Sequence, residues 1–219
     1  MKIKSVLVLV VALLIANYSL KSQSFKFGTI TADVGVGFGL YGISSHSPVN
    51  NEDISGIGLI GTLPCVDAEF GLLRFIGVGV HYRRGTYGGY KGGKIRGTDF
   101  CPMVDFHVAN KKDKFDLVLG VGYGFSNMNT PNIGSESLKA SGGLLRVQIA
   151  PHIYFGKYVG MFIRVAYNQH MLNNNIELID SNGKVYTQAD GATWNMAGVE
   201  FNFGVAAKFD IFKKKEESK

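Results

Sequence analysis

Residues 199–212, with the sequence VEFNFGVAAKFDIF, decide the fold of this chain. Every second residue of the segment is apolar, and the residues between them are mostly polar or small: Glu200, Asn202, Gly204, Lys208 and Asp210. A period of two is typical of a β-strand with two different faces. Because strands of soluble proteins usually have about five or six residues, so long a strand indicates unusual surroundings. We interpret it as the last strand of a barrel whose apolar face is turned to lipid.

The same alternation recurs in seven earlier segments. We therefore expect eight strands, at residues 29–42, 60–70, 76–83, 99–108, 115–126, 145–155, 159–168 and 199–212. The connectors are alternately long and short, so an up-and-down order places all four long connectors (43–55, 84–97, 127–141 and 169–193) at one end. The chain has 29 glycines, about twice the usual share, which agrees with many strands and turns.

The N-terminus has the layout of a secretory signal peptide. Lys2 and Lys4 precede an apolar run at 6–16, and small and polar residues follow, so we expect a signal peptide at 1–22. The apolar run is too short to span a bilayer as a helix, which needs about 20 residues. Loss of its three lysines lowers the net charge from +6 to +3, an excess too small to predict binding to nucleic acid.

Side-chain volume and charge indicate which face of the barrel is outside. An eight-stranded barrel is just wide enough for side chains to fill it, and the apolar faces carry too many large residues to fit inside. These faces contain no Asp, Glu, Lys or Arg, whereas a lipid-facing Lys or Arg costs about 2 to 4 kcal/mol at the bilayer midplane. We predict an all-β, eight-stranded antiparallel up-and-down transmembrane barrel at residues 23–212, with its apolar faces turned to lipid.

Three prolines lie inside the predicted strands. Pro64, Pro102 and Pro151 lack the N–H that a strand paired on both sides would use. We therefore expect a β-bulge at each of them.

The alternating segments, together with the pieces LPCVDAEFG, CPMVDFHV and APHIYFG, resemble the small outer-membrane β-barrel proteins of the OmpA-barrel and OmpX type. The resemblance implies a monomer without cofactor in the outer membrane of a Gram-negative-type bacterium. It also implies contact with outer-membrane lipid, including lipopolysaccharide, and insertion by the barrel-assembly machinery. Asn202, Gly204 and Phe209 match the assembly signal of these proteins, whereas Ala207 stands at an aromatic position. Residues 213–219 would form a charged periplasmic tail.

The polar strand faces would bring many ionisable side chains into the lumen. These are Asp33, Asp67, Glu69, His81, Arg83, Asp99, Asp105, His107, Asp116, Arg146, His152, Arg164, Glu200, Lys208 and Asp210. We expect them to pair with one another and fill a narrow lumen; a narrow conduction path is the alternative. Cys65 and Cys101 also face inward, two strands or about 9.5 Å apart, which is more than the roughly 7 Å that a disulfide allows. We expect no metal site.

The long connectors are where binding would reside. Arg84, Lys91, Lys94 and Arg96 form a basic patch in the second one, which is either solvated surface charge or a contact for lipopolysaccharide phosphates or another external anionic ligand. We expect a non-enzymatic structural or surface-interaction role through four extracellular loops. The alternatives are a secreted soluble barrel, a porin-like narrow channel, and a lipid A-modifying acyl hydrolase or transferase. For the last, Ser126, His170 and His46 lie at rim or loop positions, but no G-x-S-x-G elbow occurs.

Overall fold

The computed structural model describes residues 25–49, 51–88, 94–109, 114–133, 136–180 and 182–211. The predicted signal peptide and the predicted charged tail lie outside these residues. No helix among the described residues is both long and apolar enough to cross a membrane.

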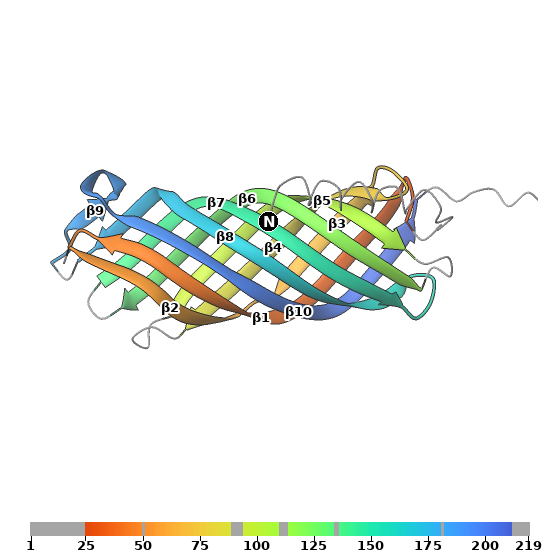
Figure 1. The fold of residues 1–219 in the computed structure, drawn as a ribbon, viewed down its shortest axis with the longest axis horizontal. Coiled ribbons are helices and arrows are strands. Elements are labelled where there is room, and N and C mark those ends of the chain that lie inside the picture. Colours follow the sequence, from red (N-terminus) through yellow and green to blue (C-terminus); the bar gives the residue numbers. More distant parts are fainter. Residues whose placement is uncertain are drawn as a thin grey trace, which may run out of the picture.

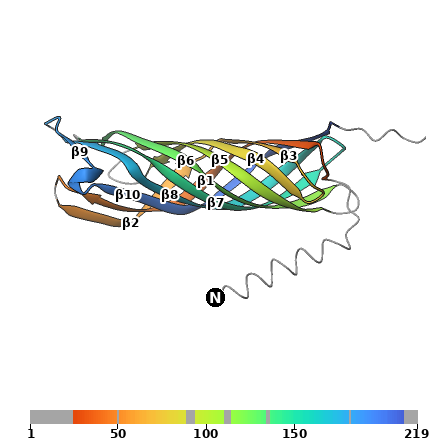
Figure 2. The same ribbon diagram turned by 90° about the horizontal axis from the view of Figure 1, so that it is seen from above.

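One antiparallel sheet contains every strand and closes on itself (Figures 1 and 2). The strands are β1 (Thr29–Ser47), β2 (Glu52–Thr62), β3 (Cys65–Gly71), β4 (Ile76–Gly88), β5 (Lys94–Ala109), β6 (Phe115–Ile133), β7 (Glu136–Tyr154), β8 (Val159–Ile179), β9 (Val185–Thr187) and β10 (Thr193–Asp210), with a 3₁₀ helix, η1 (Gln188–Asp190), before the last. β2 and β3 both pair with β1, and the register does not change where β2 ends and β3 begins. They are halves of one strand, and β9 pairs only with β8 among the described residues, so the ring has eight strands.

The first and last strands of the ring pair with each other. β1 and β10 run antiparallel in an unbroken register from Thr29 opposite Asp210 to His46 opposite Thr193. β10 pairs with β8 on its other side. This confirms the predicted all-β, up-and-down antiparallel barrel.

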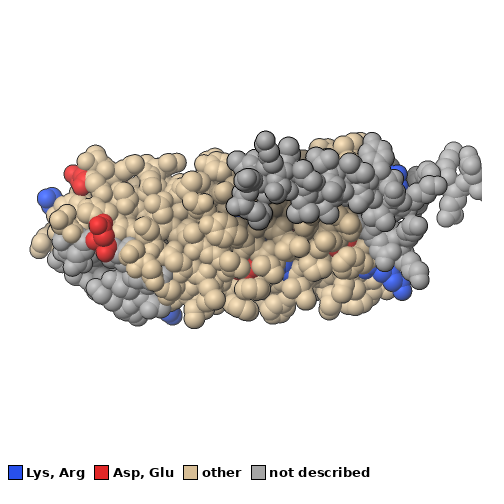
Figure 3. Space-filling view, viewed as in Figure 1, with Lys and Arg blue, Asp and Glu red and all other residues tan. Residues whose placement is uncertain are grey.

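In the segments that the sequence predicts as strands, the apolar residues lie on the outer face and the polar residues on the inner face, as predicted. Val34 and Phe203 are 60% and 59% exposed, whereas Asp33 and Lys208 on the same strands are buried. On the face drawn in Figure 3 most of the visible surface between the two ends is uncharged, with a few small charged patches right of the centre, and charged atoms also appear at both ends. The apolar residues therefore point outward, as required for contact with lipid. We call the part of the ring whose outward residues are apolar the apolar zone.

The predicted β-bulges at the prolines are wrong. At Pro64 the pairing passes from β2 to β3 without a change of register, and at Pro102 and Pro151 pairing with one neighbouring strand is interrupted and then resumes in register. Each proline therefore interrupts the pairing locally and leaves the register unchanged. The register shifts lie elsewhere, at Ile43/Ser44, Thr130/Ile133 and Ser141/Gly143.

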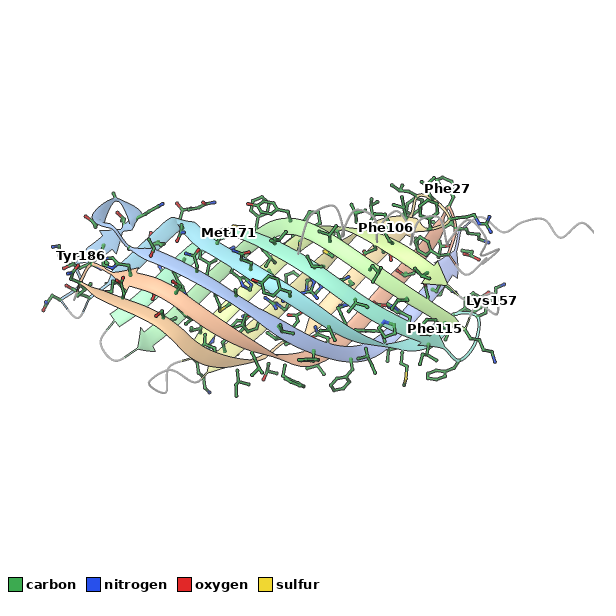
Figure 4. The ribbon with its side chains drawn as sticks, viewed as in Figure 1. Phe27, Phe106, Phe115, Lys157, Met171 and Tyr186 are labelled. Atoms are coloured by element: carbon green, nitrogen blue, oxygen red, sulfur yellow. The ribbon has the colours of Figure 1, made fainter. Side chains whose placement is uncertain are left out.

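The predicted long connectors are mostly strand. β1 has 19 residues and β8 has 21, whereas about 9 to 11 residues cross a bilayer. The ring therefore continues well past the lipid at the end that joins β1 to β2, β4 to β5, β6 to β7 and β8 to β10, which we call the loop end. The opposite, turn end has the short connectors that the sequence predicts. Figure 4 shows Tyr186 at the loop end and Phe115 and Lys157 at the turn end.

Where the strands extend past the apolar zone toward the loop end, their outward residues become polar and their inward residues become apolar. On β6, Tyr123 and Phe125 point outward and are exposed, but Asn127 and Asn129 take the outward positions above them. Met128, between these asparagines, points inward and is buried. The inward apolar residues of this part form one cluster, which we call the loop-end core: Tyr41, Ile43, Leu59, Leu63, Tyr87, Ile95, Met128, Ala140, Leu172, Ile176, Ala192, Trp194 and Met196.

A charge on the outward face tests the assignment of faces. Val36 points outward near the middle of the apolar zone, opposite Phe203 on β10. In phospholipid vesicles, Val36→Arg should lower the free energy of unfolding by about 2 to 4 kcal/mol, measured by urea titration. Ser44→Arg, also outward on β1 but beyond the apolar zone, should change it by less than about 1 kcal/mol. Equal effects of the two substitutions would contradict the placement of the bilayer.

Candidate functional site

The barrel interior below the loop-end core contains two polar clusters. The upper cluster surrounds Arg83 and Arg146, and the lower cluster surrounds Arg164 and His107. Gln148 links them, because it accepts a hydrogen bond from Arg146 Nε at 3.0 Å and donates one to Asp105 Oδ1 at 3.3 Å. All these side chains point into the lumen because residues two apart on a strand share a face.

The upper cluster is a balanced set of ion pairs. Arg83 pairs with Asp99 and Glu200, and Arg146 Nη1 lies 2.5 Å from the other oxygen of Glu200. Arg83 also donates a hydrogen bond to the Tyr41 hydroxyl at 2.6 Å. All four charged residues are 1% exposed or less. Because two cations face two carboxylates, each buried charge has a partner.

The lower cluster contains more carboxylates than guanidinium groups. Arg164 contacts Asp67 at 2.6 Å and Asp33 at 2.9 Å. The other carboxylates are in contact with histidines: His107 lies 2.6 Å from Glu69 and 2.8 Å from Asp116. The other contacts of this kind are His81 with Asp67 at 2.7 Å and His152 with Asp33 at 2.9 Å. A cavity of about 20 Å³ lies among these residues, which is room for about one water molecule.

The segment before β1 covers the turn end of the lumen. The Phe25 ring is buried and stacks on His107 with centroids 3.5 Å apart. Lys26 pairs with Asp210 at 3.0 Å, and Thr29 donates a hydrogen bond to the same carboxylate at 2.8 Å. Lys208 lies over the Tyr154 ring at 4.3 Å. Lys208 and Asp210, both predicted to lie in the lumen, are therefore near its opening at the turn end.

The structure places all fifteen predicted lumen residues on inward positions. It also shows further inward side chains that form hydrogen bonds with them. The partners outside the predicted set of fifteen are Tyr41, Ser126, Gln148, Asn168 and His170. Each points inward because it alternates with the outward residues of its strand. Ser126, Gln148 and Asn168 lie within the predicted strands, and extension of the predicted 159–168 strand by two residues would have found His170. Phe25 precedes the first strand and has no such signal.

The residues weighed for acyl transfer occupy other positions than expected. Ser126 and His170 are buried, and both contact Asp99, at 2.6 Å and 3.3 Å. The serine hydroxyl donates its hydrogen bond to the carboxylate and not to the histidine. His46, near the loop end, lies 2.8 Å from Asp53. These residues therefore do not form a serine nucleophile activated by an adjacent histidine.

Cys65 and Cys101 are both buried and are not bridged. The Cys65 sulfur lies 3.9 Å from Arg164 Nη1, and the Cys101 sulfur lies 3.6 Å from the Pro102 carbonyl oxygen. Among the described residues, no group of three or more His, Cys, Asp or Glu side chains has the arrangement of a metal site.

The predicted basic patch lies on the outer wall of the barrel, because its segment is strand. Arg84 on β4, and Lys94 and Arg96 on β5, are exposed and point outward. Lys139 on β7 joins them from a segment that the sequence analysis did not include. Lys91 lies outside the described residues.

The hairpin after β8 carries a small ordered cap at the loop end. The backbone N–H of Thr187 donates a hydrogen bond to Asp190 Oδ2 at 2.8 Å, and the Thr187 hydroxyl donates one to the same oxygen at 3.1 Å. These hydrogen bonds stabilise the ionised form and hold the pKa of Asp190 below its usual value. The cap is therefore present at neutral pH and is lost as the pH falls through that lowered pKa.

The three residues that match the assembly signal lie on β10 near the turn end. Asn202 points inward and donates a hydrogen bond to Glu200 at 2.8 Å. Phe209 points outward, is 51% exposed and stacks on Tyr158 with centroids 5.9 Å apart. A Cβ at Gly204 would lie 2.1 Å from the Val34 carbonyl oxygen, so glycine is required at this close approach of β10 to β1.

The upper cluster should be essential for stability. Glu200→Gln leaves Arg83 and Arg146 facing a single carboxylate in the interior. The loss of one partner of a buried ion pair typically costs about 3 to 5 kcal/mol, and we expect that loss in detergent micelles. Urea titration followed by the fluorescence of Trp194, the single tryptophan, measures it.

The matched control for this prediction is Glu177→Gln. Glu177 pairs with Lys139 at 3.8 Å, and both side chains are more than half exposed, so its loss should cost about 1 kcal/mol or less. Similar unfolding midpoints for Glu200→Gln and the wild type would show that the upper cluster contributes little.

Several solved structures of bacterial proteins are similar to this fold. The chain is similar to the outer membrane protein OprG from Pseudomonas aeruginosa (TM-score 0.58, 12% identity, covering 86% of this chain and 99% of that one). It is also similar to the outer membrane protease OmpT from Escherichia coli (0.53, 11%, 86% and 99%) and to Neisserial surface protein A (0.52, 16%, 83% and 97%). No protein-family model and no curated protein matches the chain. The fold is that of outer-membrane β-barrels, in agreement with the location expected from the sequence.

Proposed function

We propose that this protein is an integral outer-membrane barrel with a closed lumen, and that it acts through the surface exposed at its loop end. The loop-end core carries this proposal. Its side chains are buried inside the upper part of the ring, and Tyr87, Leu172 and Trp194 among them are at most 2% exposed. An interior packed in this way leaves the outer surface as the place where the protein meets its surroundings.

The interior opposes conduction in two successive ways. An ion entering from the loop end would first meet the apolar side chains of the loop-end core, and the transfer of an unpaired charge into apolar surroundings is very unfavourable. It would then meet Arg83 and Arg146, whose side chains cross the lumen to contact Glu200. Eight strands also enclose far less space than the sixteen or more of a porin.

The interior also supports a non-enzymatic role. Ser126 and His170 are buried beneath the loop-end core, and Asp99 accepts the hydrogen bond of the serine. The protease activity of OmpT belongs to that protein, and at 11% identity the likeness to this chain concerns the fold.

The loop end offers a rigid surface for interaction. The strands continue past the apolar zone, so the outer wall above it is a regular array of polar side chains on paired backbone. We infer that external contacts use this wall and the hairpin of β8 and β9, with Lys184 over the Tyr186 ring at 4.6 Å. Insertion by the barrel-assembly machinery through Asn202, Gly204 and Phe209 is part of the same proposal.

Planar-bilayer recording tests the closed lumen. Purified wild-type protein and Arg146→Ala should both insert without unitary currents, because the loop-end core is intact in each. A narrow channel predicts wild-type currents whose size or ion selectivity changes when the lumen loses Arg146. Reproducible wild-type currents would therefore overturn the proposal.

A further inference from the structure

One side of the projecting wall carries a cluster of cations. Arg84, Arg96 and Lys139 point outward from β4, β5 and β7, and all three are exposed. We call them the wall cations. They lie at the edge of an outward-facing hollow that polar side chains of β5 to β8 also line. Among the described residues, β10 and β1 place the uncharged pair Asn195 and Ser44 above their own apolar zone.

Strand register brings the wall cations close together. Arg96 pairs with Asn129 and Asn129 with Lys139, so the two cations stand two strands, or about 9.6 Å, apart. Arg84 pairs with Thr98, two residues after Arg96 on β5, which makes Arg84 and Arg96 diagonal neighbours about 7 to 8 Å apart. Long flexible side chains can therefore converge on one anion from three strands.

The wall cations stand at the depth of lipid headgroups. Tyr82, Phe100 and Phe125 form an outward aromatic row across β4, β5 and β6. Arg84 lies two residues above this row and Arg96 four residues above it, or about 7 and 13 Å along the strands. For strands tilted about 45°, this is roughly 5 to 10 Å above the aromatic girdle, where headgroups begin.

We propose that this wall binds a phosphate group of an anionic glycolipid in the outer leaflet, through Arg84, Arg96 and Lys139. The inference rests on the proposed function, in that the loop end faces the outside. Guanidinium groups bind phosphate through two parallel hydrogen bonds. The aromatic row beneath offers an apolar surface to the acyl chains of the same molecule.

Two features favour a lipid over a soluble anion. The cations are on the side wall, next to the apolar zone, and not on the tip of the barrel. Lys139 has an exposed contact with Glu177, 3.8 Å away, and such pairs contribute little. Lys139 can therefore exchange the carboxylate for a phosphate that approaches from the membrane.

Binding of lipid A to the full chain in neutral detergent micelles tests the proposal. The variant Arg84→Gln, Arg96→Gln, Lys139→Gln should bind lipid A that carries both phosphates about tenfold or more weakly than the wild type. The matched control, Arg74→Gln, Lys114→Gln, Lys157→Gln, removes three exposed cations from the turn end of the barrel and should bind like the wild type. Lipid A stripped of phosphate should bind equally weakly to all three proteins.

The heat-modifiable shift on a gel shows whether each variant is folded, and the single variant Lys139→Gln, with a smaller loss, supports the assignment if the triple variant does not fold. Equal weakening by the control, or undiminished binding of phosphate-free lipid A, would overturn the proposal. So would binding of a soluble sulfated oligosaccharide that needs the wall cations while lipid A does not. Currents in planar bilayers would overturn the closed lumen and leave this result standing.

Discussion

The pairing of β1 with β10 is the constraint on which the structure depends. Within lipid, every backbone N–H and C=O needs a partner in the protein, so a sheet can cross a membrane only if it has no free edge. This pairing removes the edge over the full length of the ring. The register of every strand is then fixed by the alternation of polar and apolar residues, because a shift of one residue would turn the polar side chains of that strand toward lipid.

Each long strand meets two solvents, and its side chains change face between them. In the apolar zone the strands place Val, Ile and Phe outside and ion pairs inside. Above it they place Asn, Lys and Arg outside and Trp194, Leu172 and Met128 inside. The upper part thus follows the rule of a water-soluble barrel, and the loop-end core and the wall cations are both results of this exchange.

Much of the fold could be predicted from the sequence, because lipid imposes a strict period of two. Strand number, order, closure and outward face followed from it, as did the inward parity of residues such as Asp33 and Arg164. The upper strand halves could not be recognised in the same way. Polar outward residues such as Asn127 and Asn129 have the composition of a loop, and the apolar residues between them belong to the face expected to be polar. Side-chain pairing inside the lumen depends on strands that are distant in sequence.

Closure of the ring also sets the order of folding. Thr29 and Asp210, which share a hydrogen bond, are separated by 181 positions in the chain. The other neighbouring strands of the ring follow one another closely in the chain, and local pairs form before distant ones because their loops are less costly to close. The seam between β1 and β10 is therefore the last to form, and until it does the two edge strands remain open to β-strand addition by another chain.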